Sequence, residues 1–409
     1  MTPFDSIKYH KQLLQTSFAA MDPKTGEVKC WVGGIDYKWF KFDHITTKRQ
    51  VGSTIKPLIY SLAVQDAGYD LSTVIPGGPV QYGKEVRTFT GGGGTLANCL
   101  AFSKNTASVR IANLVGVKRV VEFAKNCGIK APLPPYISLA LGSAEIPMLE
   151  MLQSYTMFPN KSLNTKPILY TRIEDKNGNI LQEFGTESKQ VMSESSAYTM
   201  VQLMQGVVQI GTARALNSYN IPVDKAGKTG TTNDNADGWF IGYTPELLAG
   251  TWVGCEDPFI RIYAGTSGGN EMAAPKWGIF MSKVYADKKL GYGKMKNFEK
   301  PAVMGNEELS GDPDFIRYAQ QGDSAMLDQG NNDAGDYINE PQPQVPQELV
   351  PIESDIKPKA DTNTKVKNKT DDKTTPKAVQ PPPLIRPLDE KEKKMIKKEK
   401  EKTGGGNEY

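Results

Sequence analysis

The sequence contains only two histidines, His10 and His44. A Ser-His-Asp triad needs a histidine held between a serine and an acid, and a histidine-rich metal site needs several imidazoles. Both kinds of site are therefore nearly excluded. No stretch approaches about 18 consecutive apolar residues, so we expect no membrane-spanning helix in this sequence. The N-terminal residues also lack the basic and apolar regions of an export signal.

Cysteine is scarce and charge is nearly balanced. The 409 residues include four cysteines without a Cys-x-x-Cys pair, and 49 Lys and Arg stand against 46 Asp and Glu. Four cysteines leave several disulfide connectivities open, and free thiols are equally compatible with the sequence. A net charge of +3 gives no reason to expect a nucleic acid or an acidic partner.

The first candidate site is the segment 49–57, which reads Arg-Gln-Val-Gly-Ser-Thr-Ile-Lys-Pro and contains a Ser-x-x-Lys motif. On a helix, positions three apart share a face, so the Lys56 amine would reach the Ser53 hydroxyl and activate it. Gly52 and Pro57 favour a helix that begins at this point. Unpaired N–H groups at a helix start would also stabilise an oxyanion. We therefore predict that Ser53 is a nucleophile and that Lys56 is its base.

A Ser-x-x-Lys match is weak by itself, because residues 354–357 fit the same pattern. Two later motifs give the first copy its context. Ser-x-Asn occurs at 103–105, between two predicted helices, and Lys-Thr-Gly occurs at 228–230, in a predicted strand. Other copies of these motifs fall at a hairpin tip, in loops or in the C-terminal tail. Class A β-lactamases and penicillin-binding proteins have these motifs in this order, with Ser-Asp-Asn as the middle member, where this chain has Ser-Lys-Asn.

Longer phrases around the motifs resemble the transpeptidase domain of class A penicillin-binding proteins, over roughly residues 5–290. The resemblance implies an α+β sandwich, with a five-stranded antiparallel sheet flanked by helices as in serine β-lactamases. It also implies action at the periplasmic face of the cytoplasmic membrane. That family usually has a membrane anchor and a glycosyltransferase domain before this point, and their absence suggests a truncated or partial product. The matching phrases are residues 49–57, 102–110, 138–142, 227–232 and 237–245.

The same resemblance implies a reaction. Ser53 would attack the carbonyl between the two terminal D-alanines of a peptidoglycan stem peptide, D-alanine would leave, and an amine of a neighbouring stem would take the acyl group. β-Lactams would acylate the same serine. Peptidoglycan stem peptides, β-lactams and cell-wall assembly proteins are the expected partners, and neither a metal nor a cofactor is expected.

Each motif residue then has an expected role. Lys56 must be neutral to act as a base, which requires its pKa to fall from about 10.4 to about 7, and we predict burial and the charge of Lys228 as the causes. Ser103 would relay a proton to the leaving amine. Backbone N–H groups of Ser53 and Thr231 would form the oxyanion hole. The predicted substrate-binding residues are Asn105, Thr229, Gly230 and Thr231.

Other functions remain open on the sequence. A D,D-carboxypeptidase or a serine β-lactamase of the same fold would resolve the acyl-enzyme with water, although residues 150–153 do not fit the Glu-x-x-Leu-Asn setting of a deacylating carboxylate. A non-catalytic penicillin-binding sensor or scaffold is a further alternative, against which the intact Ser103 and Lys228 argue. We discard a nucleotide-binding P-loop at 227–229, because Pro222 stands where a glycine is required.

Composition divides the chain into a transpeptidase domain over 1–300 and a tail over 301–409. The tail is rich in Pro, Gln, Asn, Asp and Lys, so it cannot bury enough apolar surface to offset its ordering entropy, and we predict that it is disordered. Within the domain, the residue pattern predicts helices over 5–16 and 144–158, and a hairpin over 168–184 with an Asn-Gly turn.

Overall fold

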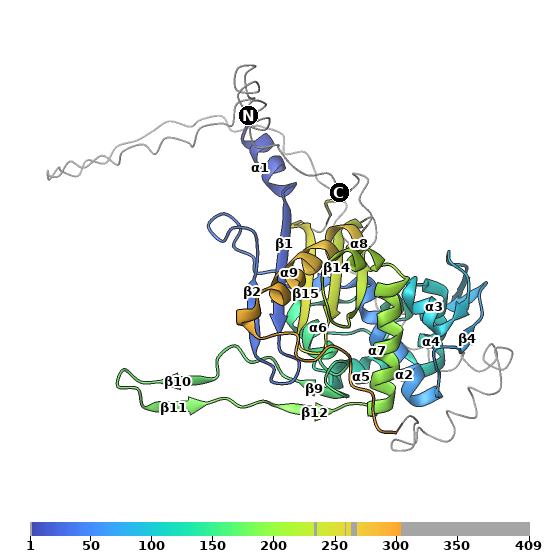
Figure 1. Cartoon of the computed structure of the whole chain (residues 1–409). Coiled ribbons are helices and arrows are strands. Elements are labelled where there is room, and N and C mark those ends of the chain that lie inside the picture. The colour runs from blue at the N-terminus through green and yellow to red at the C-terminus, as the bar shows by residue number, and fades with distance from the viewer. Residues whose placement is uncertain (1, 233–234, 258, 263–267, 304–409) are drawn as a thin grey trace, which may run out of the picture. The chain divides into compact units, whose positions relative to one another are not determined.

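A five-stranded antiparallel sheet forms the centre of the protein, with the strand order β13-β14-β15-β1-β2. Helices lie along the sheet (Figure 1), which confirms the predicted α+β class. The computed structural model describes residues 2–232, 235–257, 259–262 and 268–303. The sheet strands are β1 (Leu14–Met21), β2 (Val28–Val32), β13 (Ala226–Thr231), β14 (Asp237–Tyr243) and β15 (Leu248–Cys255).

Helix α2 (Lys56–Ala67) is the most deeply buried helix. Each of its residues from Lys56 to Asp66 is buried, as expected for a helix that is surrounded by other elements. Pro57 lies in its first turn, and Gly68 ends it in the left-handed conformation at φ 66°. The remaining helices are α1 (Pro3–Lys11), α3 (Leu96–Ala101), α4 (Asn105–Val115), α5 (Val117–Asn126), α6 (Met148–Tyr155), α7 (Glu194–Gln209), α8 (Gly269–Met272) and α9 (Ala274–Ala286).

Both faces of the sheet are covered, which explains why β14 and β15 are buried along their whole length. On one face α9 packs Trp277 against Phe240 of β14, with 5.4 Å between the ring centroids. On the other face α6 approaches β15 so closely that a Cβ at Gly250 would lie 3.2 Å from the Leu152 side chain. The sheet is therefore the middle layer of a sandwich, and β13 is one of its edges.

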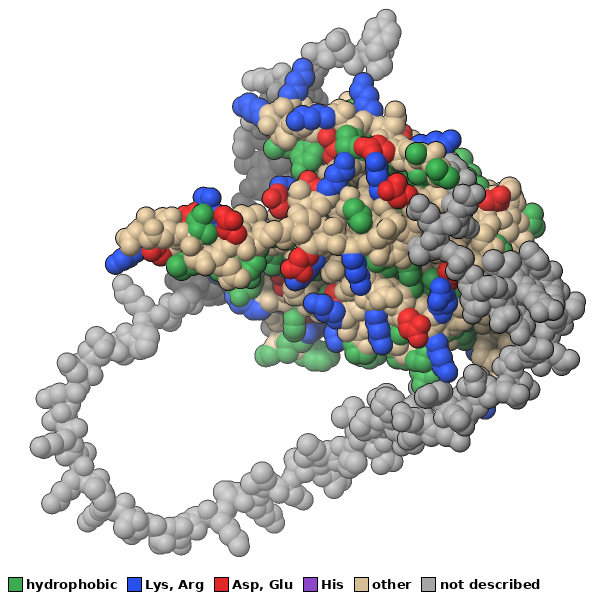
Figure 2. Space-filling model, turned by 90° about the horizontal axis from the view of Figure 1, so that it is seen from below, with side chains coloured by type: hydrophobic (Ala, Val, Ile, Leu, Met, Phe, Trp, Pro, Cys, Tyr) green, Lys and Arg blue, Asp and Glu red, His purple; other side chains and the backbone are tan. Residues whose placement is uncertain are grey.

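The predicted hairpin at 168–184 is present. Its strands β10 (Arg172–Glu174) and β11 (Ile180–Glu183) pair antiparallel, with Gly178 at φ 84° in the turn, and every residue of both strands is exposed. Figure 1 shows it as an arm that extends from the body, and Figure 2 shows basic and acidic side chains interspersed on the face seen there. The other short strands are β3 (Arg49–Gln50), β4 (Val74–Ile75), β5 (Val80–Tyr82), β6 (Glu85–Arg87), β7 (Gly94–Thr95), β8 (Glu145–Ile146), β9 (Leu163–Thr165) and β12 (Ser188–Gln190).

Two predicted helices are shorter than the sequence pattern indicated. The helix predicted over 5–16 ends at Lys11, and Leu14 already pairs with Cys255 in the central sheet. The helix predicted over 144–158 starts only at Met148, because β8 pairs with β3 immediately before it. In both places a long-range strand pairing overrides the local helical pattern.

The four cysteines are free thiols, which settles the disulfide question that the sequence left open. From residue 304 onward the predicted tail lies outside the described residues, so its disorder and the boundary at residue 300 stay predictions. In the described ranges, none of the helices combines the length and the apolar character that crossing a membrane requires.

Candidate active site

Ser53 lies in a tight 3-10 turn, η1 (Gly52–Ile55), which runs directly into α2. We predicted a regular α-helical start. The turn is tighter because Gly52 adopts a left-handed φ of 53°, and the Lys56 N–H then donates to the Ser53 carbonyl. Residues three apart eclipse each other in such a turn, so Ser53 and Lys56 share one side of it. Ser53 remains partly exposed there.

The Lys56 amine is fully buried and donates hydrogen bonds to three acceptors. These are the Ser103 carbonyl at 2.8 Å, Asn105 Oδ1 at 2.7 Å and Ser103 Oγ at 3.3 Å. Burial lowers the pKa of Lys56 from 10.5 to about 7, the value that a base at neutral pH requires. Across the described residues, no hydrogen bond joins this amine to the Ser53 hydroxyl. Catalytic contacts of this kind commonly tighten only when substrate binds.

Lys228 reaches the same place from the edge strand β13. Its buried amine donates to Ser103 Oγ at 2.9 Å and to the Thr229 carbonyl at 2.9 Å. Burial and the neighbouring charge of Lys56 hold the pKa of Lys228 well below its ordinary value. We predicted that the charge of Lys228 would help to lower the pKa of Lys56. In the structure burial accounts for the lowered pKa of Lys56. The repulsion between the two amines instead contributes to the lowered pKa of Lys228.

Ser103 contacts both lysines and has an unusual backbone conformation. It lies at the break between α3 and α4, as predicted, with a left-handed φ of 55° that is rare for residues other than glycine. Both its carbonyl and its hydroxyl accept hydrogen bonds from the Lys56 amine. A strained conformation of this kind persists only where the surroundings determine it, and such residues concentrate at functional sites.

The end of β13 lies against η1, which contains Ser53 and is called the serine turn. A Cβ at Gly52 would lie 2.6 Å from the Thr231 carbonyl oxygen, and a Cβ at Gly230 would lie 2.8 Å from the Val51 carbonyl oxygen. Neither position has room for a side chain, so the two backbones touch only because both residues are glycine. The N–H groups of Ser53 and Thr231, which we predicted as oxyanion donors, belong to these two touching segments.

The predicted substrate-binding residues are largely engaged within the protein. Asn105 accepts the hydrogen bond from Lys56 with Oδ1, which leaves its Nδ2 group as a donor. The hydroxyls of Thr229 and Thr212 are 2.6 Å apart, and the Thr231 hydroxyl accepts the N–H of Gly269 at 3.1 Å. The contacts of these residues with a substrate remain a prediction.

Some residues that shape the site were not identified from the sequence. The Tyr155 hydroxyl donates to the Thr54 carbonyl at 2.6 Å and so holds the serine turn from α6. Gly142, at φ 79°, accepts the Gly52 N–H at 3.1 Å. Only Gly142 carried a local signal, because glycine marks left-handed positions. No local pattern marks the contacts of Thr212 or Tyr155.

Burial of Lys56 predicts a specific pH dependence of stability. Lys56 titrates near pH 7 in the folded protein and near about 10.4 when unfolded, so between these values the unfolded chain binds more protons. The free energy of unfolding should therefore rise with pH in this window, by on the order of 1 kcal/mol per pH unit from this group. We expect the free energy of unfolding of wild type, relative to that of Lys56→Met, to rise accordingly from pH 7 to about pH 9 in chemical denaturation. Parallel profiles of the two proteins would contradict a low pKa for Lys56.

Comparison with known proteins agrees with this geometry. Residues 16–253 match the family model described as "Penicillin binding protein transpeptidase domain". Penicillin-binding protein 1A of Aquifex aeolicus is 35% identical over 282 residues, which are 66% of this chain and 38% of that protein. Penicillin-binding protein 1A of Neisseria gonorrhoeae is 32% identical over 314 residues, which are 72% of this chain and 38% of that protein. The chain thus spans less than half the length of these curated relatives.

Solved structures show the same fold. The crystal structure of penicillin-binding protein 1A from Haemophilus influenzae superposes with a TM-score of 0.64 at 24% identity, covering 71% of this chain and 49% of that one. The penicillin-binding protein PonA1 from Mycobacterium tuberculosis superposes with a TM-score of 0.61 at 20% identity, covering 73% of this chain and 84% of that one. A structure of PonA1 in complex with penicillin V gives a TM-score of 0.60.

Proposed function

This chain belongs to the family of penicillin-binding protein transpeptidase domains, and from that premise we propose that it is a serine D,D-transpeptidase. It would cross-link peptidoglycan stem peptides that end in D-Ala-D-Ala through an acyl-enzyme on Ser53, and β-lactams would acylate the same residue. One observation carries this proposal. The amines of Lys56 and Lys228, 172 positions apart in the chain, both donate to the hydroxyl of Ser103, at 3.3 and 2.9 Å.

Acylation begins with proton transfer from Ser53 Oγ to the neutral amine of Lys56. Ser53 Oγ then bonds to the carbonyl carbon of the D-Ala-D-Ala peptide bond, and the carbonyl oxygen becomes an oxyanion. The N–H groups of Ser53 and Thr231 would stabilise this charge. Removing one such donor costs about 10²–10³-fold in rate in other serine enzymes. A base that is half neutral near pH 7 suits the first step, because proton transfer is most efficient when the pKa lies near the working pH.

The leaving group requires a proton in the second half of acylation. When the carbon–nitrogen bond breaks, the amine of the departing D-alanine takes a proton. Ser103 Oγ would deliver this proton and would regain one from Lys56, whose amine lies 3.3 Å away. Lys228 holds the same hydroxyl at 2.9 Å and stabilises negative charge that develops on it. The second amine, from a neighbouring stem, attacks the acyl-enzyme by the reverse of these transfers.

The alternatives differ in what resolves the acyl-enzyme. A β-lactamase or carboxypeptidase activates water at this stage. The Glu150 carboxylate is occupied by the backbone N–H groups of Lys130 and Ala131, both at 2.9 Å, which supports our view that it is not a deacylating base. The described side chains that hydrogen-bond to the Lys56 and Lys228 amines are those of Ser103 and Asn105, neither of them acidic. We therefore favour transfer to an amine. From the family to which the chain belongs, we also propose that it acts at the periplasmic face of the cytoplasmic membrane.

A donor and acceptor assay tests this proposal. The purified chain should release D-alanine from a peptide ending in D-Ala-D-Ala, and an added amine acceptor should divert product from the hydrolysed acid to the cross-linked peptide as its concentration rises. Ser53→Ala serves as the control and should release none. Hydrolysed product at every acceptor concentration would indicate a carboxypeptidase, and rapid turnover of penicillin would indicate a β-lactamase. Folded protein that releases no D-alanine and binds no penicillin covalently would favour a scaffold.

A further inference from the structure

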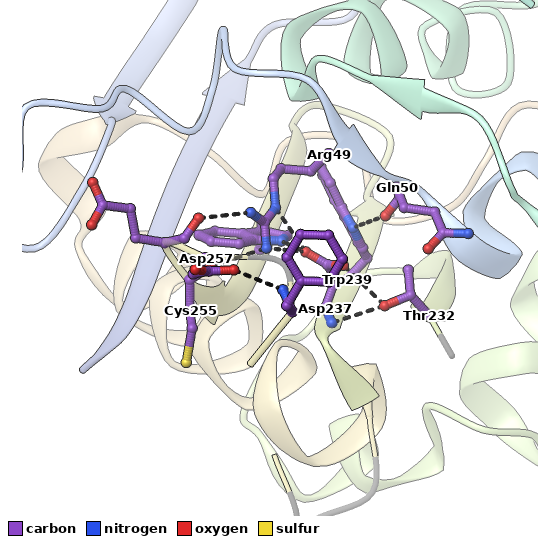
Figure 3. A network of polar contacts seen from close by, with 10 residues as sticks. Arg49, Gln50, Thr232, Asp237, Trp239, Cys255 and Asp257 are labelled. Atoms are coloured by element: carbon purple, nitrogen blue, oxygen red, sulfur yellow. Dashed lines mark hydrogen bonds and ion pairs between the residues drawn. The ribbon is translucent and has the colours of Figure 1, made fainter. Parts of the chain in front are cut away.

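Arg49 and Asp237 form a buried ion pair (Figure 3). It is separate from the lysine cluster, which consists of Lys56, Ser103, Asn105 and Lys228. Arg49 Nε of β3 donates to Asp237 Oδ1 of β14 at 2.9 Å, and Arg49 Nη2 lies 2.8 Å from the same oxygen in an ion pair. The side chains are only 6% and 3% exposed. The Trp252 indole N–H donates to the same oxygen at 2.9 Å, and the Arg49 guanidinium lies 4.8 Å from the centre of the Trp252 ring.

Further hydrogen bonds complete the network. Arg49 also donates to the carbonyls of Cys255 and Glu256 at the end of β15, at 3.0 and 3.1 Å. The second carboxylate oxygen of Asp237 accepts the Thr232 hydroxyl at 2.9 Å, and the Asp237 N–H donates back to that hydroxyl at 2.9 Å. Every charged group of the pair is therefore hydrogen-bonded within the protein.

The network connects the two segments that carry the proposed oxyanion donors. Arg49 stands four positions before Ser53, on the strand that runs into the serine turn, and Thr232 directly follows Thr231. A second bond supports the connection, because the Trp239 indole N–H donates to the Gln50 carbonyl at 2.9 Å (Figure 3). The carboxylate of Asp237 thus links the two segments through side-chain hydrogen bonds, in addition to their direct backbone contact.

Stability alone is a poor explanation for such a pair. Desolvation of two charges commonly cancels their attraction, and well-packed apolar residues of similar size are often as stabilising. A charged pair with several directional hydrogen bonds does, however, fix geometry closely. Displacement of about 1 Å at a reacting centre costs up to about 10²-fold in rate, so a device that fixes geometry here has a clear use.

We propose that Arg49 and Asp237 are positioning residues, which hold the N–H groups of Ser53 and Thr231 at the spacing that a tetrahedral oxyanion requires. The proposal rests on the proposed function, because it concerns the same acylation step. The pair acts through Thr232 and the backbone and does not touch the reacting atoms. Its loss therefore lowers the rate of bond formation on Ser53 and leaves the initial binding of a β-lactam nearly unchanged.

Two variants of different severity test this. Asp237→Asn removes the charge at constant shape. Thr232→Val removes the two hydrogen bonds of the Thr232 hydroxyl, while the ion pair and the backbone bond from the Thr232 N–H to the Asp237 carbonyl stay intact. Stopped-flow labelling with a fluorescent penicillin separates the initial dissociation constant from the acylation rate constant. We expect the rate constant to fall about 10–100-fold in Asp237→Asn and about 3–10-fold in Thr232→Val, with dissociation constants within about twofold of wild type. Affinity for a peptide boronic acid, which forms a tetrahedral adduct on the serine, should fall in parallel.

Asp66→Asn is the matched control. Asp66 pairs with Arg119, its side chain is also only 6% exposed, and it lies about 15 Å along α2 from Lys56. This variant should lower the melting temperature but keep the wild-type acylation rate and boronate affinity. Folded Thr232→Val with the wild-type acylation rate constant and boronate affinity would overturn the proposal, even if Asp237→Asn failed to fold. An equal loss in Asp66→Asn would overturn it as well. Wild-type protein that is never acylated would instead refute the proposed function.

Discussion

Replacing Ser53 with alanine is expected to abolish covalent labelling by a fluorescent penicillin, a loss of at least about 10³-fold in labelling rate. The acyl bond would form on the hydroxyl that this substitution removes. Ser53 is partly exposed, so we expect the melting temperature to stay close to that of wild type. Gel fluorescence after labelling, with circular dichroism of the same sample, measures both quantities.

Ser354 supplies the matched control, because it belongs to the second Ser-x-x-Lys match in the sequence and lies outside the described residues. Ser354→Ala should be labelled at the wild-type rate. Persistent labelling of Ser53→Ala, or loss of labelling in Ser354→Ala, would show that the motif was assigned to the wrong copy.

Replacing Lys56 should have the second largest effect. Loss of a general base costs about 10²–10⁴-fold in rate, and we expect a fall of that size in the acylation of Lys56→Met. In wild type the rate should be constant above pH 7 and should fall about tenfold per pH unit below it, because protonation of Lys56 removes the base. Acylation rates measured from about pH 5.5 to about pH 9 test this profile.

Lys56→Arg distinguishes loss of the base from loss of positive charge. Arginine keeps the charge and a long side chain but cannot be deprotonated in proteins. It should be as slow as Lys56→Met across the whole pH range. An arginine variant with more than about a tenth of the wild-type rate would show that Lys56 supplies charge and does not accept the proton.

The class of the fold and the residues of the lysine cluster could be predicted from the sequence. Ser-x-x-Lys, Ser-x-Asn and Lys-Thr-Gly are each short patterns whose chemistry follows from the residues themselves. The structure brings Lys56, Ser103, Asn105 and Lys228 into direct contact, as this prediction requires. The catalytic roles of these residues, and of Ser53, remain predictions that the experiments above test.

The remaining features depend on contacts between distant segments. Arg49 and Asp237 are 188 positions apart, and although each begins one of the phrases that resemble the family, neither phrase indicates that the two side chains meet. The start of β1 at Leu14 follows from its pairing with Cys255, which no local pattern encodes. The left-handed backbone at Ser103 was likewise not predicted, because local propensity disfavours it for a serine and the hydrogen bonds around it come from other elements.

The most direct test of the account is to locate the acyl group itself. After reaction with penicillin and digestion with trypsin, the adduct mass should appear on the peptide spanning residues 50–84, and fragmentation should place it on Ser53. An adduct on another residue, or folded protein that carries no adduct at all, would contradict the claim that a buried, uncharged Lys56 activates this serine.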